Sequence, residues 1–436
     1  MTISGQAASL SRIAQLRFGL GLKGTAHAPE DAVAALKAQL RGPDPIRFPE
    51  LVDTGSCLAQ WRDDTLSPVA EGMPTRVQRI LRREKALQMD AVLGTGAPFR
   101  ERLVWFWANH FTVSLARLEV YPTVGAFVRE AIRPHVTGRF EDMLLAVMRH
   151  PAMLMYLDNA TSVGPESPGG RASGIGLNEN LGRECLELHT ISPEAGYSQA
   201  DVTRFSEIIT GWTVDFGAPR PGFHFDNALH QPGTKTVLGR EFPAGEAGGV
   251  EALRWLADHP ATHRFLATKL TRHFVADEPA EADVAAIAAV LRDTHGDLGA
   301  AAAALVDLPA AWVPLTKLRS PQDYVVAALR AVDLPAKLRP SVDDAVFSLG
   351  QPLWEPPLPN GWPDRAADWA GPEALLRRAE WAHGVATLAG ERDVMDMAER
   401  HFGPLLSDNT RGAIRSAGSR LDALTLFLSA PEFLRR

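Results

Sequence analysis

Hydrophobic side chains recur at helical spacing along most of this chain. The clearest case is residues 99–111, where every fourth position carries a large apolar side chain: Phe99, Leu103, Trp107 and Phe111. A spacing of four places these side chains on one face of a helix, so this segment is predicted to be a core helix. Similar patterns separated by Pro- and Gly-rich stretches predict a series of helices over residues 7–150.

Two further helices are predicted in the middle of the chain. Asn178 is a suitable N-cap for a helix over residues 179–189. Ser198 and Asp201 have the spacing of a capping box, and this second helix is expected to stop at Gly211. The Gly-, Ser- and Pro-rich stretch before them, residues 159–177, predicts a loop of a length that often has a functional role.

The β content is expected to be small. Alternating apolar and polar side chains at residues 223–226 and a short apolar stretch at residues 236–239 predict two strands that pair in one hairpin. Helical patterns return after residue 248, interrupted by the extended Pro-rich segment 350–363. The predicted fold is therefore mainly α, multi-helical and globular, with a minor β-hairpin.

The chain divides into three regions by pattern. They are an N-terminal helical region (residues 1–150), a central region with the Gly-rich loop and short hairpin (151–245) and a C-terminal helical region (246–436). We expect the three to form one compact unit.

Charge and composition narrow the classes of partner. The 45 basic residues do not outnumber the 52 acidic ones, and the net charge of -7 argues against a nucleic-acid-binding protein. The two cysteines, Cys57 and Cys185, are too few for a disulfide framework. Neither a transmembrane segment nor an export signal is apparent, so a cytoplasmic location is expected.

The first candidate for chemistry is a polar arc on the helix predicted over residues 179–189. At about 100° per residue, the arc gathers Glu179, Asn180, Arg183, Glu184 and Glu187. One interpretation is a solvated face with ion pairs at i,i+4 spacing. The other is a catalytic carboxylate pair in which Arg183 lowers the pKa of one partner and the other acts as a base or metal ligand.

Two histidines are candidates beside this arc. His189 lies about 140° from Glu184 on a regular helix, so the two cannot address one atom unless the helix ends early. Asn109 and His110 end the tryptophan-rich helix, where His110 is either a core or capping residue or a catalytic one.

A metal site is the second candidate. His224, Asp226 and His230 offer the two imidazoles and one carboxylate that suit zinc or non-haem iron. Their spacing matches no fixed zinc motif, so hydrogen-bonded loop histidines are the alternative.

Substrate contacts are the third candidate. Trp212, Trp354 and Trp362 can stack on sugars or other flat rings, or pack in the core. Asn109, Asn180 and Lys235 are candidate polar contacts to a substrate. The chain has no nucleophile elbow, phosphate-binding loop, dinucleotide fingerprint or HExxH motif.

Several motifs together resemble the bacterial domain of unknown function 1800 family along nearly the whole chain. They are HPAMLMYLDN (150–159), NENLGRECLELHT (178–190), YSQADVT (197–203), TGWT (210–213), HQPGTKTVLG (230–239), HPAT (259–262), LGQPLW (349–354) and NGWP (360–363). The family has no established activity, so the resemblance assigns no catalytic residue. The position of Gln231 is commonly acidic in similar proteins, which weakens the metal interpretation of that segment.

The resemblance also bears on location and partners. Many similar proteins are exported and often stand beside a twin-arginine-exported protein of the domain of unknown function 1501 family. Because this chain shows no signal of its own, the resemblance implies either cytoplasmic residence or a periplasmic location reached by co-export with such a partner.

Two functions remain open at this stage. The first is an enzyme, a hydrolase or transferase, whose pocket uses Glu184, Glu187 and Arg183, helped by His110, His189 and His230, for acid–base or divalent-metal chemistry. The second is a non-catalytic binding or maturation protein that engages an exported protein, a glycan or a small molecule.

Overall fold

The computed structural model of the chain describes residues 3–390 and 392–436, and confirms a mainly α fold with a minor β element. Helices of the first half are α1 (Ile3–Arg17), α2 (Ala32–Ala38), α3 (Thr54–Leu66), α4 (Arg76–Gly94), α5 (Pro98–His110), α6 (Val124–Phe127), α7 (Phe140–Arg149), α8 (Pro151–Tyr156), α9 (Pro168–Ser173), α10 (Asn180–Glu184) and α11 (Gln199–Ile208). Helices of the second half are α12 (Glu246–Ala257), α13 (Pro260–Phe274), α14 (Glu281–Asp293), α15 (Leu298–Asp307), α16 (Pro321–Val332), α17 (Val342–Ser348), α18 (Ala366–Trp369), α19 (Pro372–Leu388), α20 (Val394–His401), α21 (Asp408–Arg415) and α22 (Arg420–Ser429).

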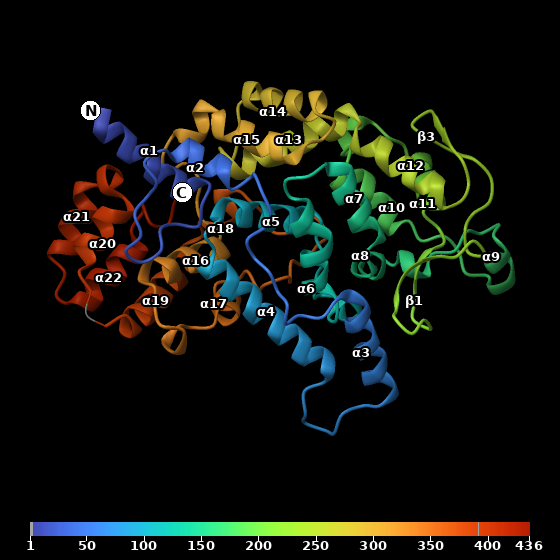
Figure 1. The fold of residues 1–436 in the computed structure, drawn as a ribbon, viewed down its shortest axis with the longest axis horizontal. Helices are drawn as coiled ribbons and strands as arrows, with labels where there is room; N and C mark the ends of the chain where they lie inside the picture. The colour runs from blue at the N-terminus through green and yellow to red at the C-terminus, as the bar shows by residue number, and fades with distance from the viewer. Residues whose placement is uncertain (1–2, 391) are drawn as a thin grey trace.

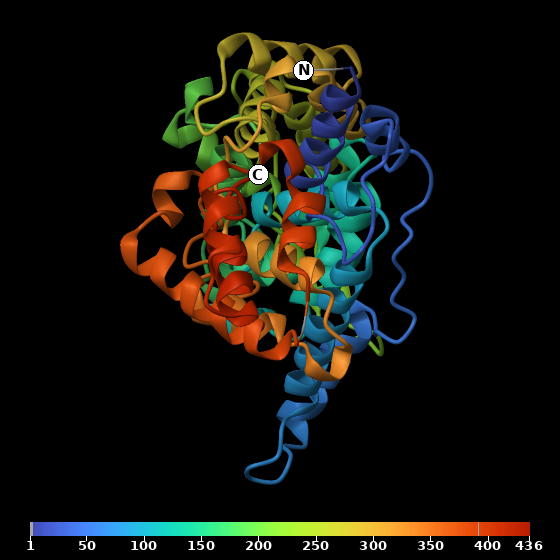
Figure 2. The same cartoon turned by 90° about the vertical axis from the view of Figure 1, so that its left-hand side faces the viewer.

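Shorter helical turns connect these elements. The 3-10 turns are η1 (Leu118–Val120), η3 (Arg133–His135), η4 (Asn159–Thr161), η6 (Pro193–Ala195), η7 (Pro309–Trp312), η8 (Ala336–Leu338) and η9 (Gly403–Leu405). Two segments are π-helical: η2 (Val128–Ile132) and η5 (Cys185–His189). Figure 1 shows the C-terminal helices α19 to α22 at one end of the molecule and the β-hairpins with α9 at the other. Helices α3 and α4 project from the body as a long hairpin (Figure 2).

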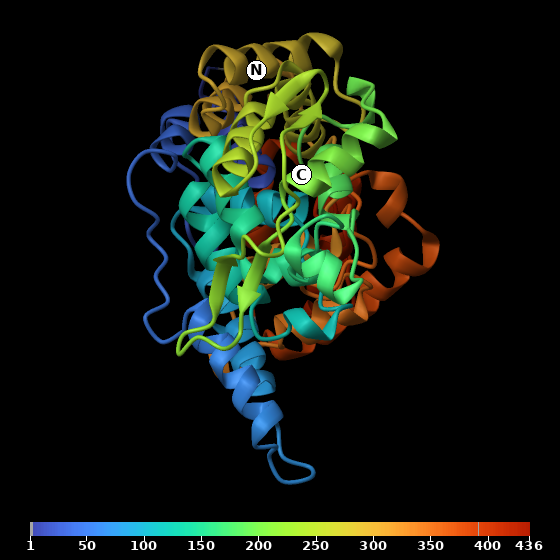
Figure 3. The ribbon, with the colours of Figure 1, turned by 90° about the vertical axis from the view of Figure 1, so that its right-hand side faces the viewer.

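The β structure differs from the predicted single hairpin. Strand β1 (Trp212–Asp215) pairs antiparallel with β2 (Gly222–Phe225), and β3 (Lys235–Val237) pairs with β4 (Arg240–Phe242). The two predicted strands are both present but belong to different sheets, so their predicted pairing was wrong (Figure 3). The physical reason is local: Leu238 and Gly239 both have positive φ, 47° and 78°, which suits a two-residue turn back onto β4.

The buried hydrophobic side chains form two clusters. The first takes in most of the chain up to Ala311, and the second unites part of α4 with residues from Tyr324 to Phe433. The α1 segment serves both, because Ala14 and Phe18 belong to the first cluster and the neighbouring Leu16 and Leu20 to the second.

Helix α5 bears out the predicted apolar stripe. Phe99, Leu103, Trp107 and Phe111 are all buried in the first cluster. The stripe occupies one side of α5, which leaves Arg102, Trp105, Asn109 and other side chains to line a cleft on another side.

The helix predicted over residues 179–189 changes type midway. It is α-helical in α10, and then continues as the π-helix η5. A π-helix adds a residue to the turn, so the regular 100° spacing used in the prediction does not hold beyond Glu184. The second predicted helix is confirmed as α11, with Ser198 and Asp201 forming the capping box.

Candidate functional site in a cationic cleft

A cleft of about 310 Å³ lies between α5, α13, the start of α16 and residues 360–368. Segments far apart in the sequence therefore form its walls. Its lining includes five side chains that carry positive charge at neutral pH, namely Arg102, Lys269, Arg272, Arg365 and Arg436. Three carboxylates face them: Asp323, Asp364 and Asp368. The lining thus has an excess of two positive charges, although the whole chain carries a net charge of -7.

Helix α13 supplies the basic wall. Lys269, Arg272 and His273 are spaced i, i+3 and i+4, which places them on one face of the helix. The imidazole Nδ1 atom of His273 lies 2.8 Å from the Oδ2 atom of Asp364. Burial lowers the pKa of His273 to about 4, against the opposing effect of Asp364, so this imidazole is neutral near pH 7 and its Nδ1–H donates to the carboxylate.

The carboxylates of Asp323, which is buried, and Asp364, which is half-buried, are both engaged. Arg102 holds Asp323 through two hydrogen bonds of 2.6 and 2.8 Å, and Arg436 Nε lies 3.1 Å from the same carboxylate. His273 holds Asp364, and Lys317 Nζ lies 3.9 Å from its Oδ1. Burial alone would raise the pKa of Asp364, but His273, Lys317 and Arg436 lower it below its usual range.

The third acid, Asp368, is also engaged. Its Oδ2 accepts a hydrogen bond of 3.3 Å from the Arg365 backbone N–H at the start of α18.

Lys269 and Arg272 have no such partner. Neither side chain makes an ion pair with a carboxylate in residues 3–390 or 392–436, and the only hydrogen bond of the Arg272 side chain is 3.3 Å to the Asp277 carbonyl. The ammonium of Lys269 lies 5.5 Å from the centre of the Phe265 ring. The Lys269 side chain is half-buried, and burial, with repulsion from Arg272 and against the opposing effect of Asp364, lowers its pKa to about 8.

The structure brings the predicted His110 and His189 together, and of the two His110 lines the cleft. His110 Nε2 lies 3.1 Å from the His189 carbonyl oxygen, and the two rings are 6.1 Å apart. Burial, helped by the charge of Lys269, holds the pKa of His110 well below its usual value and lowers that of His189 to about 3. His110 Nδ1 and both ring nitrogens of His189 are buried without a hydrogen-bond partner among the described residues. Both rings are therefore neutral and hydrophobically packed, close to a cation.

Asn109 positions the opposite wall. Its side-chain amide donates to the Trp362 carbonyl at 2.9 Å and accepts from the Trp362 N–H at 2.8 Å. Gly361, directly before Trp362, has a φ of +79°, and a Cβ at Gly361 would lie 2.5 Å from the Asn109 carbonyl oxygen. The predicted substrate contacts Asn109 and Trp362 thus both line the cleft, with Asn109 acting as the residue that fixes Trp362.

The predicted carboxylate arc lies elsewhere on the molecule. Arg183 pairs with Glu179 at 2.9 Å and also bonds Gln199, rather than binding Glu184 or Glu187. Asn180 donates to Asp158 at 3.1 Å and is exposed.

Glu184 and Glu187 are half-buried and interact with each other. Burial and the charge of Glu187 raise the pKa of Glu184. Burial and Glu184 together raise the pKa of Tyr156 to about 12. A catalytic role for the two glutamates stays a prediction.

The predicted metal ligands do not converge. His224 is exposed on β2, and Asp226 accepts a hydrogen bond from the Ala228 N–H. Both ring nitrogens of His230 are used by the backbone: Nδ1 donates to the Thr210 carbonyl at 2.9 Å and Nε2 accepts from the Gly245 N–H at 2.8 Å. Within the part of the chain that the structure describes, no three His, Cys, Asp or Glu side chains form a group that could hold a metal ion.

Lys235 and Trp212 have structural surroundings. The Lys235 amine is buried beside the Gln231 carbonyl, to which it donates, and burial lowers its pKa to about 8 despite the nearby Glu207. Trp212 is fully buried, and the Arg149 guanidinium lies 5.3 Å from its ring centre. Neither side chain is open to a substrate, so the structure does not support their predicted role.

Comparison with known proteins bears on this arrangement. A family model described as "Protein of unknown function (DUF1800)" matches residues 13–435, and so covers both cores and all of the cleft lining except Arg436. The chain belongs to this family. No curated protein and no solved structure matches it.

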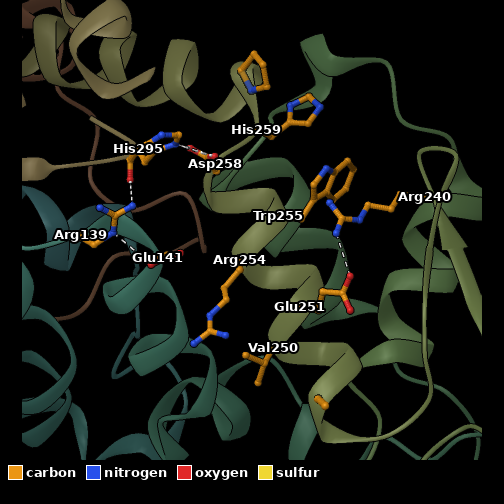
Figure 4. A pocket seen from close by; sticks show the side chains of 12 residues that line it. Arg139, Glu141, Arg240, Val250, Glu251, Arg254, Trp255, Asp258, His259 and His295 are labelled. Atoms are coloured by element: carbon orange, nitrogen blue, oxygen red, sulfur yellow. Dashed lines mark hydrogen bonds and ion pairs between the residues drawn. The ribbon is translucent and has the colours of Figure 1, made fainter. Parts of the chain in front are cut away.

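The DUF1800 chain has a second, wider hollow of about 930 Å³ beside α12. Figure 4 shows that its charged side chains are mostly paired, as Arg139 is with Glu141 at 3.2 Å and Arg240 with Glu251 at 2.9 Å. Arg254 is the exception, because its guanidinium makes no ion pair with another described residue. The hollow is open to solvent, and water and salt screen the charge of Arg254. The cationic cleft is therefore the better candidate site.

Sequence reasoning missed most of the cleft of this DUF1800 protein. Lys269, Arg272 and His273 of α13 were not singled out, because polar residues on a helix face are ordinarily assigned to solvent, and neither was Asp364, which precedes α18. The available signal was weak: three basic residues at i, i+3 and i+4 without an acidic residue beside them on the same helix face.

In residues 3–390 and 392–436, no helix has the length and apolar character needed to cross a membrane.

Proposed function

We propose that the protein binds a small anionic molecule in the cationic cleft and exchanges a proton with it through Lys269. The observation that carries this proposal is the contrast within the cleft. Its carboxylates are engaged by Arg102, Arg436, His273 and Lys317, and the side chains of Lys269 and Arg272 have no carboxylate partner among the described residues.

A half-buried ammonium that makes no ion pair with a described carboxylate is suited to an anionic ligand. In a site with restricted access to water, the attraction between Lys269 and an anion is stronger than it is at an open surface. A pKa near 8 also lets Lys269 donate a proton to charge that develops on the ligand and recover it near neutral pH. This is the acid–base form of the enzyme hypothesis.

Binding of simple anions tests the site. Acetate, benzoate and inorganic phosphate are titrated into the full-length protein at pH 6.5, 8 and 9.5 by calorimetry. Since a hydrogen bond to a charged group contributes about 1.5–3 kcal/mol, Lys269→Met is expected to weaken binding by roughly 10-fold to 100-fold at pH 6.5. Binding to the natural protein is expected to weaken above pH 8, as the ammonium loses its proton.

The matched control is Arg254→Met, which removes the unpaired cation of the α12 hollow. This variant is expected to bind the anions as the natural protein does. Equal binding by Lys269→Met and the natural protein, or loss of binding in Arg254→Met alone, would contradict the proposal.

Proton exchange is measured by repeating the titration at pH 8 in buffers of different ionisation enthalpy. An anion beside Lys269 favours the ammonium, so binding is expected to take up at most about half a proton in the natural protein and none in Lys269→Met. Identical proton uptake in both proteins would show that another group exchanges the proton.

A further inference from the structure

A small apolar chamber of about 70 Å³ adjoins the cationic cleft. The two hollows share four lining residues: Trp105, Asn109, Gln322 and Trp362. A ligand held by Lys269 therefore has a neighbouring space that continues past the two tryptophans.

The chamber walls present a mainly apolar surface to a ligand. Val104, Trp105, Ala108, Leu353 and Trp354 contribute apolar surface. The polar side chains among its lining are largely committed to the protein itself. Glu101 is held by Arg133 at 2.7 Å, Gln88 bonds Glu84 at 3.0 Å, and Thr112 donates to the Asn109 carbonyl at 2.8 Å.

The backbone holds one wall in an uncommon conformation. Trp354 has a φ of +61°, a region that bulky side chains rarely occupy. The Leu115 N–H donates to the Trp354 carbonyl at 2.8 Å, and Ser114 Oγ donates to the Pro356 carbonyl at 2.6 Å, which together fix this conformation. Such conformations persist where surrounding structure imposes them, often at ligand sites.

We infer that the ligand is an amphipathic anion whose head group binds at Lys269 and Arg272 and whose short apolar tail enters the chamber beside Trp105. This inference rests on the proposed function of the cleft. One water molecule takes about 30 Å³ in the liquid, so the chamber of about 70 Å³ has room for about two. We expect an apolar tail of about two to four carbon atoms to fill this space. A long acyl chain does not fit.

A homologous series of ligands tests the inference. Straight-chain carboxylates from acetate to octanoate, and the corresponding alkyl phosphates, are titrated into the full-length protein at pH 6.5. Burying one methylene contributes about 0.8 kcal/mol, so each added carbon is expected to raise affinity roughly fourfold until the chamber is full. Beyond about four tail carbons the affinity is expected to stop rising.

Filling the chamber provides the second measurement. Ala108→Leu adds three carbon atoms to the chamber wall and is expected to lower the ratio of pentanoate to acetate affinity severalfold. Ala286→Leu, on the exposed side of α14, is the matched control and is expected to keep the natural ratio.

The outcomes separate the two proposals. Anion binding that requires Lys269 but is independent of tail length overturns the chamber inference and leaves the anion site intact. Absence of anion binding, or binding that is independent of Lys269, overturns the proposed function and the inference with it. Continued gain up to octanoate overturns the stated tail length.

Discussion

The guanidinium of Arg102 and the carboxylate of Asp323 form a bidentate ion pair, at 2.6 and 2.8 Å, that joins α5 to α16. Both side chains are buried, and they connect a helix of the first hydrophobic cluster to a helix of the second. Burial alone would raise the pKa of Asp323, but Arg102 and Arg436 hold it well below its usual range. The pair therefore fixes the floor of the cleft and the junction of the two cores.

Asp323→Asn is expected to lower the free energy of unfolding by about 3–5 kcal/mol, because it leaves the Arg102 charge buried without its carboxylate partner. Urea unfolding followed by circular dichroism measures this loss. Asp307→Asn breaks the exposed pair with Lys37 and is expected to cost only about 0–1 kcal/mol. Similar losses in both variants would show that the buried pair has no special role.

Stability is expected to fall as the solution becomes acidic, and His401 is one cause. Burial, helped by nearby arginines, lowers the pKa of His401 to about 3. An unfolded histidine titrates near pH 6.5, so between about pH 6.5 and 3 the unfolded chain binds a proton that the folded protein refuses. The stabilisation is thus present above pH 6.5 and lost as the pH falls through this window.

His401→Phe is expected to make the melting temperature depend less steeply on pH between 6.5 and 4. Phe402 and Phe427 already surround the ring, so a phenyl group suits the site. The exposed His383→Phe serves as the control and is expected to leave the slope unchanged. If the melting temperature of His401→Phe depends on pH as steeply as that of the natural protein, groups other than His401 cause the acid sensitivity.

Gly361→Ala is expected to destabilise the protein by about 1–3 kcal/mol, because φ is +79° and the new Cβ would meet the Asn109 carbonyl at 2.5 Å. Displacement of Trp362 is also expected to weaken anion binding in the cleft. Thermal unfolding and calorimetry measure the two effects. Gly371→Ala is the control, since this glycine has a φ of -58° and a Cβ there meets no atom within 4 Å. Matching results for both glycines would contradict the expected strain.

Glu184→Gln is expected to raise the melting temperature at pH 8. Burial and Glu187 raise the pKa of Glu184, so the folded state favours the protonated carboxyl. The stabilisation that this protonated carboxyl gives is complete below the pKa of Glu184 in the unfolded chain. It is lost as the pH rises through the higher pKa of Glu184 in the folded protein. At pH 4, where the carboxyl is largely protonated, the variant and the natural protein are expected to differ little.

Glu179→Gln is the matched control beside the same helix. A hydrogen bond from Thr203, together with Gln199 and Arg183, lowers the pKa of Glu179, so removing its charge is expected to reduce stability at pH 8. Equal shifts of the same sign in the two variants would contradict the different surroundings assigned to these glutamates.

Local elements could be predicted from the amino-acid sequence. The four-residue spacing in residues 99–111 fixed the buried side of α5, and Ser198 with Asp201 fixed the start of α11. These features depend on neighbours within one or two helical turns, which the sequence places directly. The motifs likewise established the family, which the match over residues 13–435 shows.

Which helix faces meet became known from the three-dimensional fold alone. Arg102 and Asp323 are 221 residues apart in the chain, and Asn109 and Trp362 are 253 apart. Helical periodicity tells which side chains share a face but not what that face packs against. Whether a charge such as Lys269 lies in solvent or in a cleft depends on the elements folded around it, and its partial burial there sets its pKa and its chemistry.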